Sequence, residues 1–198
     1  MRDLALGIGP KDFDVATNAT PEQVQKLFRR SRLIGRRFQI VHVTYFGKER
    51  PEIIEVSTFR AVLESVGEHI AESGRILRDN VWGSMEHDAA RRDFTINAMY
   101  YDPETQVVVD FHKGIQDAQK KVLRMIGDPA TRYREDPVRI IRAVRFAAKL
   151  SQLGFTLESK TAAPLVQSQQ LLQEVPQSRM FDEMLKLLQT GHAIATIE

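Results

Sequence analysis

The sequence predicts an α+β protein in which a small mixed β-sheet with its helices is followed by an entirely helical segment. Two runs with strand character, residues 38–46 and 53–59, flank a charged turn and predict a β-hairpin. A further short strand is expected over residues 107–111, and every periodic segment after it has helical spacing. We therefore expect a head, residues 1–127, and an all-α neck, residues 128–198, separated where Gly-Asp-Pro breaks the pattern.

The head begins with features that predict one strand and one helix. Residues 12–15 have the character of a short strand. Thr20 and Gln23 match a capping box, with proline at the first helical position, so a helix should run from there to about Arg30. Glycines and charges with weak periodicity make residues 63–80 a predicted loop.

Helical spacing returns over residues 87–100 and dominates the neck. Asp136, followed by proline, predicts the N-cap of the clearest helix. One face of that helix is apolar, with Val138, Ile141, Val144 and Ala148, and another carries Arg139, Arg142 and Arg145. Ser178 should open a last amphipathic helix that Gly191 ends. Its apolar residues are Phe181, Met184, Leu185 and Leu188.

The composition excludes several classes of protein. With 198 residues and 42% hydrophobic content, the chain can bury a core. It has no cysteines, which excludes disulfides and thiolate zinc sites and fits a reducing compartment, so the expected location is cytoplasmic. No apolar window of about 18 residues exists, and the first residues lack the apolar region of a secretory signal, so we expect neither membrane insertion nor secretion.

Charge is more informative in its distribution than in its sum. The net charge of +2 is too small to identify a polyanionic partner, but the arginines are clustered. One cluster is Arg29, Arg30, Arg32, Arg36 and Arg37, and the other is Arg132, Arg134, Arg139, Arg142 and Arg145. Each cluster is either a patch that binds phosphates or an ordinary solvated face.

Asp12 and Asp14 are spaced so that a strand would point both carboxylates to one face. Two like charges there need a cation, and oxygen ligands suit magnesium, which a carboxylate pair can hold during phosphate displacement. The alternative for the pair is a polar turn or a solvated strand edge. Glu55 lies on a nearby predicted strand and is either a third carboxylate of the same cluster or an exposed strand residue.

Three motifs follow one another along the chain. Arg2-Asp3, Leu6-Gly7, Asp12-Phe13-Asp14 and Thr17 form the first, which resembles the second half of the signature of class II nucleotidyltransferases of the polymerase beta superfamily. Residues 91–99, Arg-Arg-Asp-Phe-Thr-Ile-Asn-Ala-Met, and residues 135–146, which begin Glu-Asp-Pro-Val-Arg, match two more family motifs in order. The resemblance covers nearly the whole chain and implies a nucleotidyltransferase head followed by an RNA- and nucleobase-binding neck.

The resemblance implies roles for the head residues. Asp12 and Asp14 would ligate Mg²⁺ and activate an RNA 3′-hydroxyl for attack on the α-phosphate of ATP, releasing pyrophosphate. Asp93 would be a further active-site residue, with Arg92 and Asn97 near ribose or phosphates. The alternative for Asp93 is an ion pair on a helix surface.

The resemblance also assigns nucleotide-binding residues outside that group. Arg2 and Asp3 belong to the nucleotide-binding signature. Asp136 and Arg139 match the pair that reads the nucleobase edge, an acceptor and a donor fork one helical turn apart. The alternative for Asp136 is an N-cap, a role that it could combine with reading the base. The alternative for Arg139 is a solvated arginine. Arg142 and Arg145 would face triphosphate or RNA. Together with the head residues, these residues make up the predicted site.

Two activities share these motifs, polyadenylation of RNA and addition of CCA to tRNA. Residues 34–43 and 179–188 look like the versions found in bacterial poly(A) polymerases, so we expect template-independent transfer of AMP from ATP to RNA 3′-ends, which promotes RNA decay. RNA and ATP would be the partners. RNA affinity should fall steeply with salt. The sequence does not define an oligomeric state.

The chain departs from the family at its ends. The family signature begins with a strand and a Gly-Gly pair just before the Arg-Asp found here as Arg2-Asp3, and those glycines let the backbone approach the triphosphate. The family also continues past the neck into further RNA-holding segments. Since this sequence starts at Met1 and ends at Glu198, we expect a fragment, for which a catalytically inactive nucleotide- or RNA-binding role is the remaining alternative.

Overall fold

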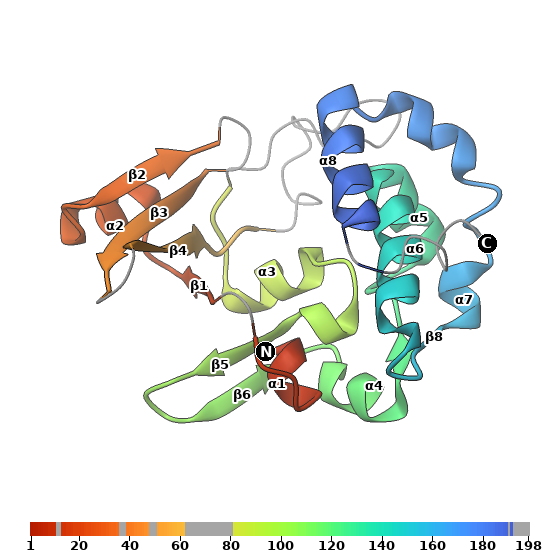
Figure 1. Cartoon of the computed structure of the whole chain (residues 1–198), viewed down its shortest axis with the longest axis horizontal. Helices are drawn as coiled ribbons and strands as arrows, with labels where there is room; N and C mark the ends of the chain where they lie inside the picture. Colours follow the sequence, from red (N-terminus) through yellow and green to blue (C-terminus); the bar gives the residue numbers. More distant parts are fainter. Residues whose placement is uncertain (11–12, 36–38, 48–50, 62–80, 190, 192–198) are drawn as a thin grey trace.

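A computed structural model describes residues 1–10, 13–35, 39–47, 51–61, 81–189 and 191. A sheet-containing part lies on one side of the molecule, and a mainly helical part formed by residues 129–188 lies on the other (Figure 1). Asp12 and the predicted loop over 63–80 lie outside the described residues, as do Arg36 and Arg37.

The head contains a mixed 4-stranded sheet with the strand order β1-β4-β3-β2. The strands are β1 (Asp14–Thr17), β2 (Ser31–Ile34), β3 (Ile40–Phe46) and β4 (Pro51–Thr58). β1 runs parallel to β4, and the β4–β3 and β3–β2 pairs are antiparallel. The predicted hairpin is confirmed as β3–β4, whereas β1 starts later than expected and β2 was not predicted.

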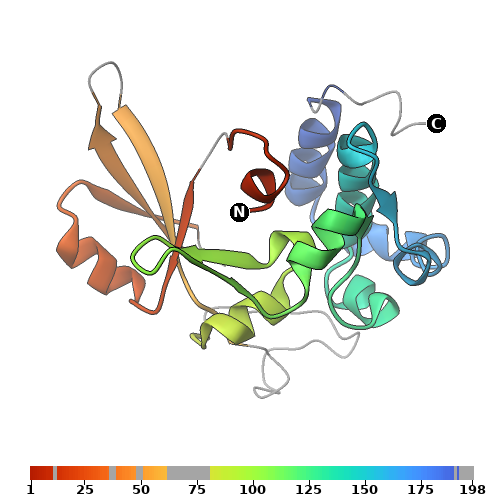
Figure 2. The same cartoon turned by 90° about the horizontal axis from the view of Figure 1, so that it is seen from below.

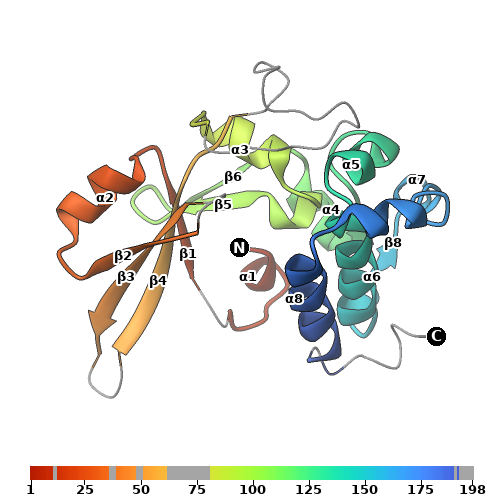
Figure 3. The same cartoon turned by 90° about the horizontal axis from the view of Figure 1, so that it is seen from above.

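Helix α2 (Pro21–Leu27) starts with the predicted capping box, in which Gln23 N donates to Thr20 Oγ1 and Thr20 N donates to Gln23 Oε1. It ends at Leu27 rather than Arg30 because the chain turns directly into β2. Val24 packs against buried valines of β3 and β4, so α2 covers one face of the sheet. The opposite face is turned toward α1 (Arg2–Ala5) and α8 (Gln177–Leu188) (Figure 3).

The second part of the head joins short helices to a 2-stranded sheet. Its elements are α1 (Arg2–Ala5), α3 (Met85–Arg91), a 3₁₀ turn (Thr95–Asn97), β5 (Met99–Asp102), β6 (Val107–Asp110) and α4 (Gly114–Lys120). The β5–β6 hairpin reaches from the helices toward the 4-stranded sheet (Figure 2). The strand predicted over 107–111 is confirmed.

The helix predicted over 87–100 is wrong beyond Arg91. Arg92 is extended, with ψ of 164°, and the chain continues through a 3₁₀ turn into β5. Phe94 and Ile96 are completely buried, so burying both takes precedence over continuing a helix whose opposite face would be polar.

The remaining elements surround the largest apolar core. They are β7 (Val122–Leu123), α5 (Pro129–Glu135), α6 (Val138–Ser151), β8 (Thr156–Leu157), α7 (Ser159–Ala162), a 3₁₀ segment (Gln169–Glu174) and α8 (Gln177–Leu188). β7 and β8 form a short parallel pair, so the predicted all-α neck includes one two-residue strand. The core joins Phe94, Ile96 and Leu123 to Ile140 and Phe146. The boundary near residue 127 stays a prediction.

The predicted apolar face is mostly confirmed on α6 and wrong on α8. On α6, Val138, Ile141 and Ala148 are buried as predicted, but Val144 is 37% exposed, and Arg139 and Arg145 are buried as well. On α8, the predicted apolar residues are exposed, and Glu183 and Leu187 are the buried ones. Within the described residues, no helix is both long and apolar enough to cross a membrane.

Candidate active site

A cleft of about 1700 Å³ runs between β1, the α3–β5 region and helices α5, α6 and α8. The residues that line it include most of the predicted site. They are Arg2, Asp3, Asp14, Arg92, Asp93, Asn97, Asp136, Arg139 and Arg142. Glu55 and Arg145 are not among the lining residues. The cleft thus brings together residues that are far apart in the sequence.

Asp93 is the centre of the cleft wall and is only 6% exposed. Its Oδ2 accepts hydrogen bonds from Arg142, with Nε at 2.8 Å and Nη2 at 2.6 Å, and its Oδ1 accepts from Asn97 Nδ2 and Phe94 N. Burial alone would raise the pKa of Asp93, but Arg142 and these hydrogen bonds outweigh it and hold the pKa below its ordinary value of 3.8. Asp93 is therefore a fixed, ionised carboxylate rather than a surface ion pair.

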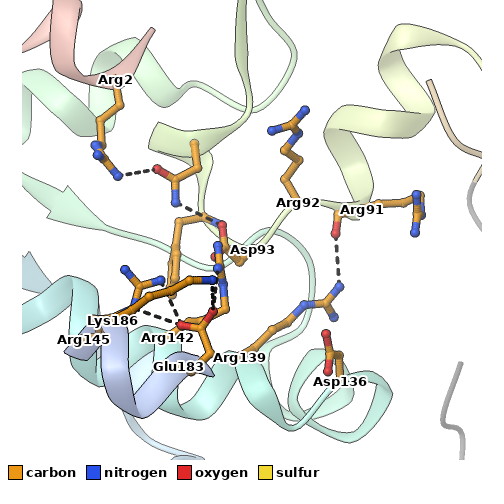
Figure 4. A network of polar contacts seen from close by, with 12 residues as sticks. Arg2, Arg91, Arg92, Asp93, Asp136, Arg139, Arg142, Arg145, Glu183 and Lys186 are labelled. Atoms are coloured by element: carbon orange, nitrogen blue, oxygen red, sulfur yellow. Dashed lines mark hydrogen bonds and ion pairs between the residues drawn. The ribbon is translucent and has the colours of Figure 1, made fainter. Parts of the chain in front are cut away.

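Asn97 links Asp93 to the start of the chain (Figure 4). Arg2 Nη1 donates to Asn97 Oδ1 at 3.1 Å, and Arg2 Nε donates to Asp3 Oδ1 at 2.8 Å. The 3₁₀ turn that carries Asn97 starts two residues after Asp93, and the Asn97 amide bonds Asp93 and Arg2 at once. Arg2 is held in this way at the mouth of the cleft.

Glu183 of α8 neutralises the arginines of α6 from the opposite side (Figure 4). It is 6% exposed, and its Oε2 accepts from Arg145 Nε and Nη2, both at 3.0 Å. Its Oε1 lies 3.5 Å from Arg142 Nη1 and 3.3 Å from Lys186 Nζ. Sequence reasoning missed this residue, although it lies in the segment 179–188 that resembled poly(A) polymerases.

The ring of Phe146 on α6 contacts guanidinium groups of the same region. The guanidinium carbons of Arg145, Arg2 and Arg142 lie 4.5, 5.3 and 5.4 Å from the ring centroid. Such contacts favour cations through the ring quadrupole. We call the set Arg2, Asp93, Asn97, Arg142, Arg145, Phe146 and Glu183 the Asp93 network.

Asp136 does not cap α6 with its side chain, contrary to the prediction. Its two carboxylate oxygens instead accept from the two Nη atoms of Arg179, each at 3.0 Å. This bidentate pair joins the start of α6 to α8, and it occupies the oxygens that a cap would need. Arg179 is a second functional candidate from segment 179–188.

Arg139 is buried, so the alternative that it is an ordinary solvated arginine is wrong. Its Nη1 donates to Glu135 and to the carbonyl of Arg132, and its Nη2 donates to the carbonyl of Arg91. Arg132, which is partly buried, donates to the carbonyls of residues 90, 91 and 92. Burial and the neighbouring Arg139 lower the pKa of Arg132 to about 10. These bonds fix the end of α3 against α5 and α6.

Arg92 faces the cleft from the end of α3. Its Nη2 lies 3.1 Å from Asp88 Oδ2, which also accepts from the Tyr100 hydroxyl at 2.6 Å. The guanidinium carbon lies 5.4 Å from the Tyr100 ring centroid. Arg92 is thus oriented by neighbours on α3 and β5 while it lines the cleft.

Asp14 lies in register with Glu55 on the neighbouring strand. Paired residues point to the same face of a sheet, so both carboxylates lie on the face opposite α2. Glu55 is in register with His42 on β3, and its Oε1 lies 3.4 Å from His42 Nε2. His42 is in turn in register with Arg32 on β2. A row of ionisable side chains therefore crosses the sheet from Asp14 to Arg32.

The oxygen donors of Asp14 and Glu55 are of the kind that magnesium prefers. Within the described residues, no cluster of at least three histidine, cysteine, aspartate or glutamate side chains has the spacing of a metal site. Asp12, the partner predicted for Asp14, lies outside those residues. The described donors fit a magnesium site in chemical type, and the position of the ion stays a prediction.

Comparison with known proteins identifies the family. The family described as "Poly A polymerase head domain" matches residues 1–124, more than half of the chain. The chain belongs to this poly(A) polymerase head family. A second family, described as "Probable RNA and SrmB- binding site of polymerase A", matches residues 154–198.

Alignments with named relatives cover nearly the whole chain. Poly(A) polymerase I of Escherichia coli O6:H1 is 53% identical over 201 aligned positions, covering 99% of this chain. The Haemophilus influenzae protein of the same name is 51% identical, and a CCA-adding enzyme of Bacillus velezensis is 38% identical. The chain spans only 42 to 44% of the length of these relatives.

A solved structure agrees with this assignment. The CCA-adding enzyme of Bacillus stearothermophilus, solved in complex with CTP, superposes with a TM-score of 0.77 and 35% identity. The match covers 94% of this chain and 42% of that enzyme. The α+β nucleotidyltransferase fold predicted from the sequence is thereby confirmed.

Proposed function

We propose that this chain carries the nucleotide-transfer site of a poly(A) polymerase, which adds AMP from ATP to RNA 3′-ends. The observation that carries the proposal is the Asp93 network, which apart from Arg145 lines one wall of a cleft that Asp14 also lines. Cationic side chains and a carboxylate in one cleft suit a triphosphate that reacts with a hydroxyl. The 53% identity with poly(A) polymerase I supports polyadenylation over CCA addition.

The chemistry assigned to the chain's own residues follows from their charge and fixation. Arg92, Arg142 and Arg2 line the cleft as cations and would bind the phosphates and ribose of ATP. Asp14, which is exposed to the cleft, would accept the proton of the RNA 3′-hydroxyl as its oxygen bonds to the α-phosphorus and pyrophosphate leaves. Asp93 would hold Arg142 in place for this reaction.

Magnesium is part of the proposal. Asp14, with Asp12 and assisted from the next strand by Glu55, would hold it, and when bound the ion would offset the negative charge of the phosphates. The carboxylates and the phosphates are both negatively charged, so holding them close together requires such a cation. A requirement for a divalent cation is therefore expected.

Asp136 and Arg139 are proposed to select the base. Asp136 is an acceptor and Arg139 a donor on the cleft wall, which suits the edge of a purine that both donates and accepts. Arg179 fixes the orientation of Asp136 through its bidentate pair. RNA processing of this kind would place the protein in the cytoplasm.

Primer extension tests the proposed function. The chain is incubated with magnesium, a labelled RNA and either ATP or CTP, and the products are separated by length. Long products with ATP alone are expected, and substitution of Asp14 by asparagine should reduce their rate at least about 100-fold, as loss of an essential proton acceptor does. Short products that need both nucleotides would instead assign CCA addition, the activity named for the relatives at 38% identity.

The control is Asp102→Asn. Asp102 also lines the cleft, but its carboxylate bonds the backbone and hydroxyl of its own turn, Glu104 and Thr105. Its variant should extend the primer at close to the normal rate. Equal activity of the Asp14→Asn chain and the unsubstituted chain would contradict the assignment of Asp14.

A further inference from the structure

The face of the 4-stranded sheet opposite α2 carries a continuous set of side chains beyond the catalytic carboxylate. Val41 and Val43 of β3 are buried beneath α2, so the alternate residues His42, Thr44 and Phe46 lie on the other face. We call this the open face. It begins at Asp14 and Glu55 on one side of the sheet and ends at β2 on the other.

The far end of the open face is cationic. Arg32 is paired in register with His42 and therefore points to the open face, and it is exposed. Arg30 lies two residues earlier, so by alternation its side chain points to the same face. Its carbonyl accepts a hydrogen bond from Thr44 N at 2.9 Å. Neither arginine forms an ion pair with a carboxylate in the described part of the chain. Their charges are available to an anionic partner.

An aromatic ring lies beside these charges. Phe46, the last residue of β3, is 63% exposed, and the guanidinium carbon of Arg30 lies 4.5 Å from its ring centroid. Exposing a phenylalanine to this degree leaves apolar area in water that a partner would cover. A ring next to unpaired arginines is the combination that binds single-stranded nucleic acid, through base stacking and phosphate contacts.

We propose that the open face binds the single-stranded RNA just upstream of its 3′-end, with Phe46 and Arg30 as a base-stacking platform and Arg32 as a phosphate contact. This inference rests on the proposed function, because it places the 3′-hydroxyl at Asp14. A folded protein partner is disfavoured, because the exposed apolar side chains here, Phe46 and Ile53, lie beside the positive charges of Arg30 and Arg32.

The geometry sets the length of RNA that reaches the platform. From Asp14 two strand spacings lead to β3 and four residues along β3 lead to Phe46, a separation of about 17 Å. At about 3.4 Å per stacked nucleotide, this corresponds to about five nucleotides. RNA of three nucleotides should therefore not reach Phe46, whereas RNA of ten should.

The test measures binding of oligoadenylates of three and ten nucleotides by fluorescence anisotropy, without ATP. The unsubstituted chain should bind the longer RNA more tightly. Phe46→Ala should weaken binding of the ten-nucleotide RNA at least about fivefold, as loss of one stacked base does, and leave the three-nucleotide RNA unchanged. Phe46→Leu, which keeps apolar bulk without a ring, should behave like alanine, and Phe46→Tyr should bind normally.

Tyr45 provides the matched control. It is the preceding residue of the same strand, is 49% exposed and lies on the α2 face by alternation, so Tyr45→Ala should leave both affinities unchanged. Normal binding by Phe46→Ala, an equal loss for both RNA lengths, or an equal loss in Tyr45→Ala would overturn the proposal.

The same experiment separates this inference from the proposed function. Extension of a three-nucleotide primer with ATP depends on the cleft and not on the platform. If that extension fails while the length-dependent binding and its Phe46 dependence are present, the platform stands and the proposed activity is wrong. If extension succeeds and Phe46→Ala has no effect on long primers, the platform is wrong and the activity stands.

Discussion

The Asp93 network and the open face carry the same kinds of side chain in opposite states. In the network, Asp93 and Glu183 are each 6% exposed, and both bond arginines of α6. On the open face, Arg30 and Arg32 are exposed and no described carboxylate pairs with them. Buried, paired charges hold a fixed geometry, whereas exposed charges contribute affinity that salt screens. The comparison therefore separates the part that orients a nucleotide from the part that attracts RNA.

The largest effect is expected from removing the centre of the network. Asp93→Ala leaves the partly buried Arg142 with only Glu183 nearby as counter-charge and removes the acceptor of Asn97 Nδ2 and Phe94 N, which should cost about 3 kcal/mol of unfolding free energy. Urea denaturation followed by circular dichroism measures this loss. Asp14→Ala, on the exposed side of the cleft, is the matched control and should change stability by less than about 0.5 kcal/mol. Similar losses in the two variants would erase the distinction between the regions.

Acid should weaken the network in a way that depends on Asp93. Because the pKa of Asp93 is lowered in the folded chain, its contribution is complete above the ordinary value of 3.8 and is lost as the pH falls through the lower folded value. The stability difference between the unsubstituted chain and Asp93→Asn should therefore shrink below about pH 4. Urea midpoints at pH 6 and pH 3 measure it. A difference that stays constant over this range would contradict a lowered pKa.

Nucleotide choice should respond to the pair between α6 and α8. Arg179→Ala removes both hydrogen bonds that orient Asp136, and because the pair is partly exposed we expect a discounted effect of about 1 kcal/mol. The preference for ATP over CTP, as a ratio of kcat/KM values, should fall by about fivefold. Arg134→Ala, an exposed arginine on α5, should leave the ratio unchanged. A changed stability with an unchanged ratio would assign Arg179 a purely structural role.

The smallest effect is expected on the open face. Arg32→Ala should alter stability by less than about 0.5 kcal/mol, because the side chain is exposed and forms no ion pair with a described residue. It should lower the slope of log affinity against log salt by about 0.7 for the ten-nucleotide RNA, the value for one phosphate contact on a single strand. Lys26→Ala, on α2 at the covered face, should leave the slope unchanged. An identical salt slope for Arg32→Ala would remove Arg32 from the RNA contact.

Local signals in the sequence located much of the fold. The capping box at Thr20 and the hairpin of β3 and β4 were predicted correctly because each depends on neighbouring residues. The end of α3 was not, because the burial of Phe94 and Ile96 depends on the packing of α4, β7 and α6 around them. Periodicity does not show which distant elements will cover a residue.

The site was predicted in its members more than in their bonds. Motif resemblance named Asp93, Asn97 and Arg142, which the structure brings into contact. It did not name Glu183, because a glutamate on an amphipathic helix is expected to be solvated. Only the packing of α8 against α6 shows that it is buried beside Arg145. The N-cap expected of Asp136 failed for the same reason, since its partner Arg179 is far away in the sequence.

The core that joins the two predicted parts has a consequence for engineering. The rings of Phe94 and Phe146 meet edge to face, with centroids 5.7 Å apart, and they come from opposite sides of residue 127. β7 and β8 also pair across that point. A chimera that exchanges the head of one nucleotidyltransferase for another at residue 127 would therefore pair unmatched halves of one core. Exchanges should keep residues 94–157 from a single parent and place their junctions in the 4-stranded sheet instead.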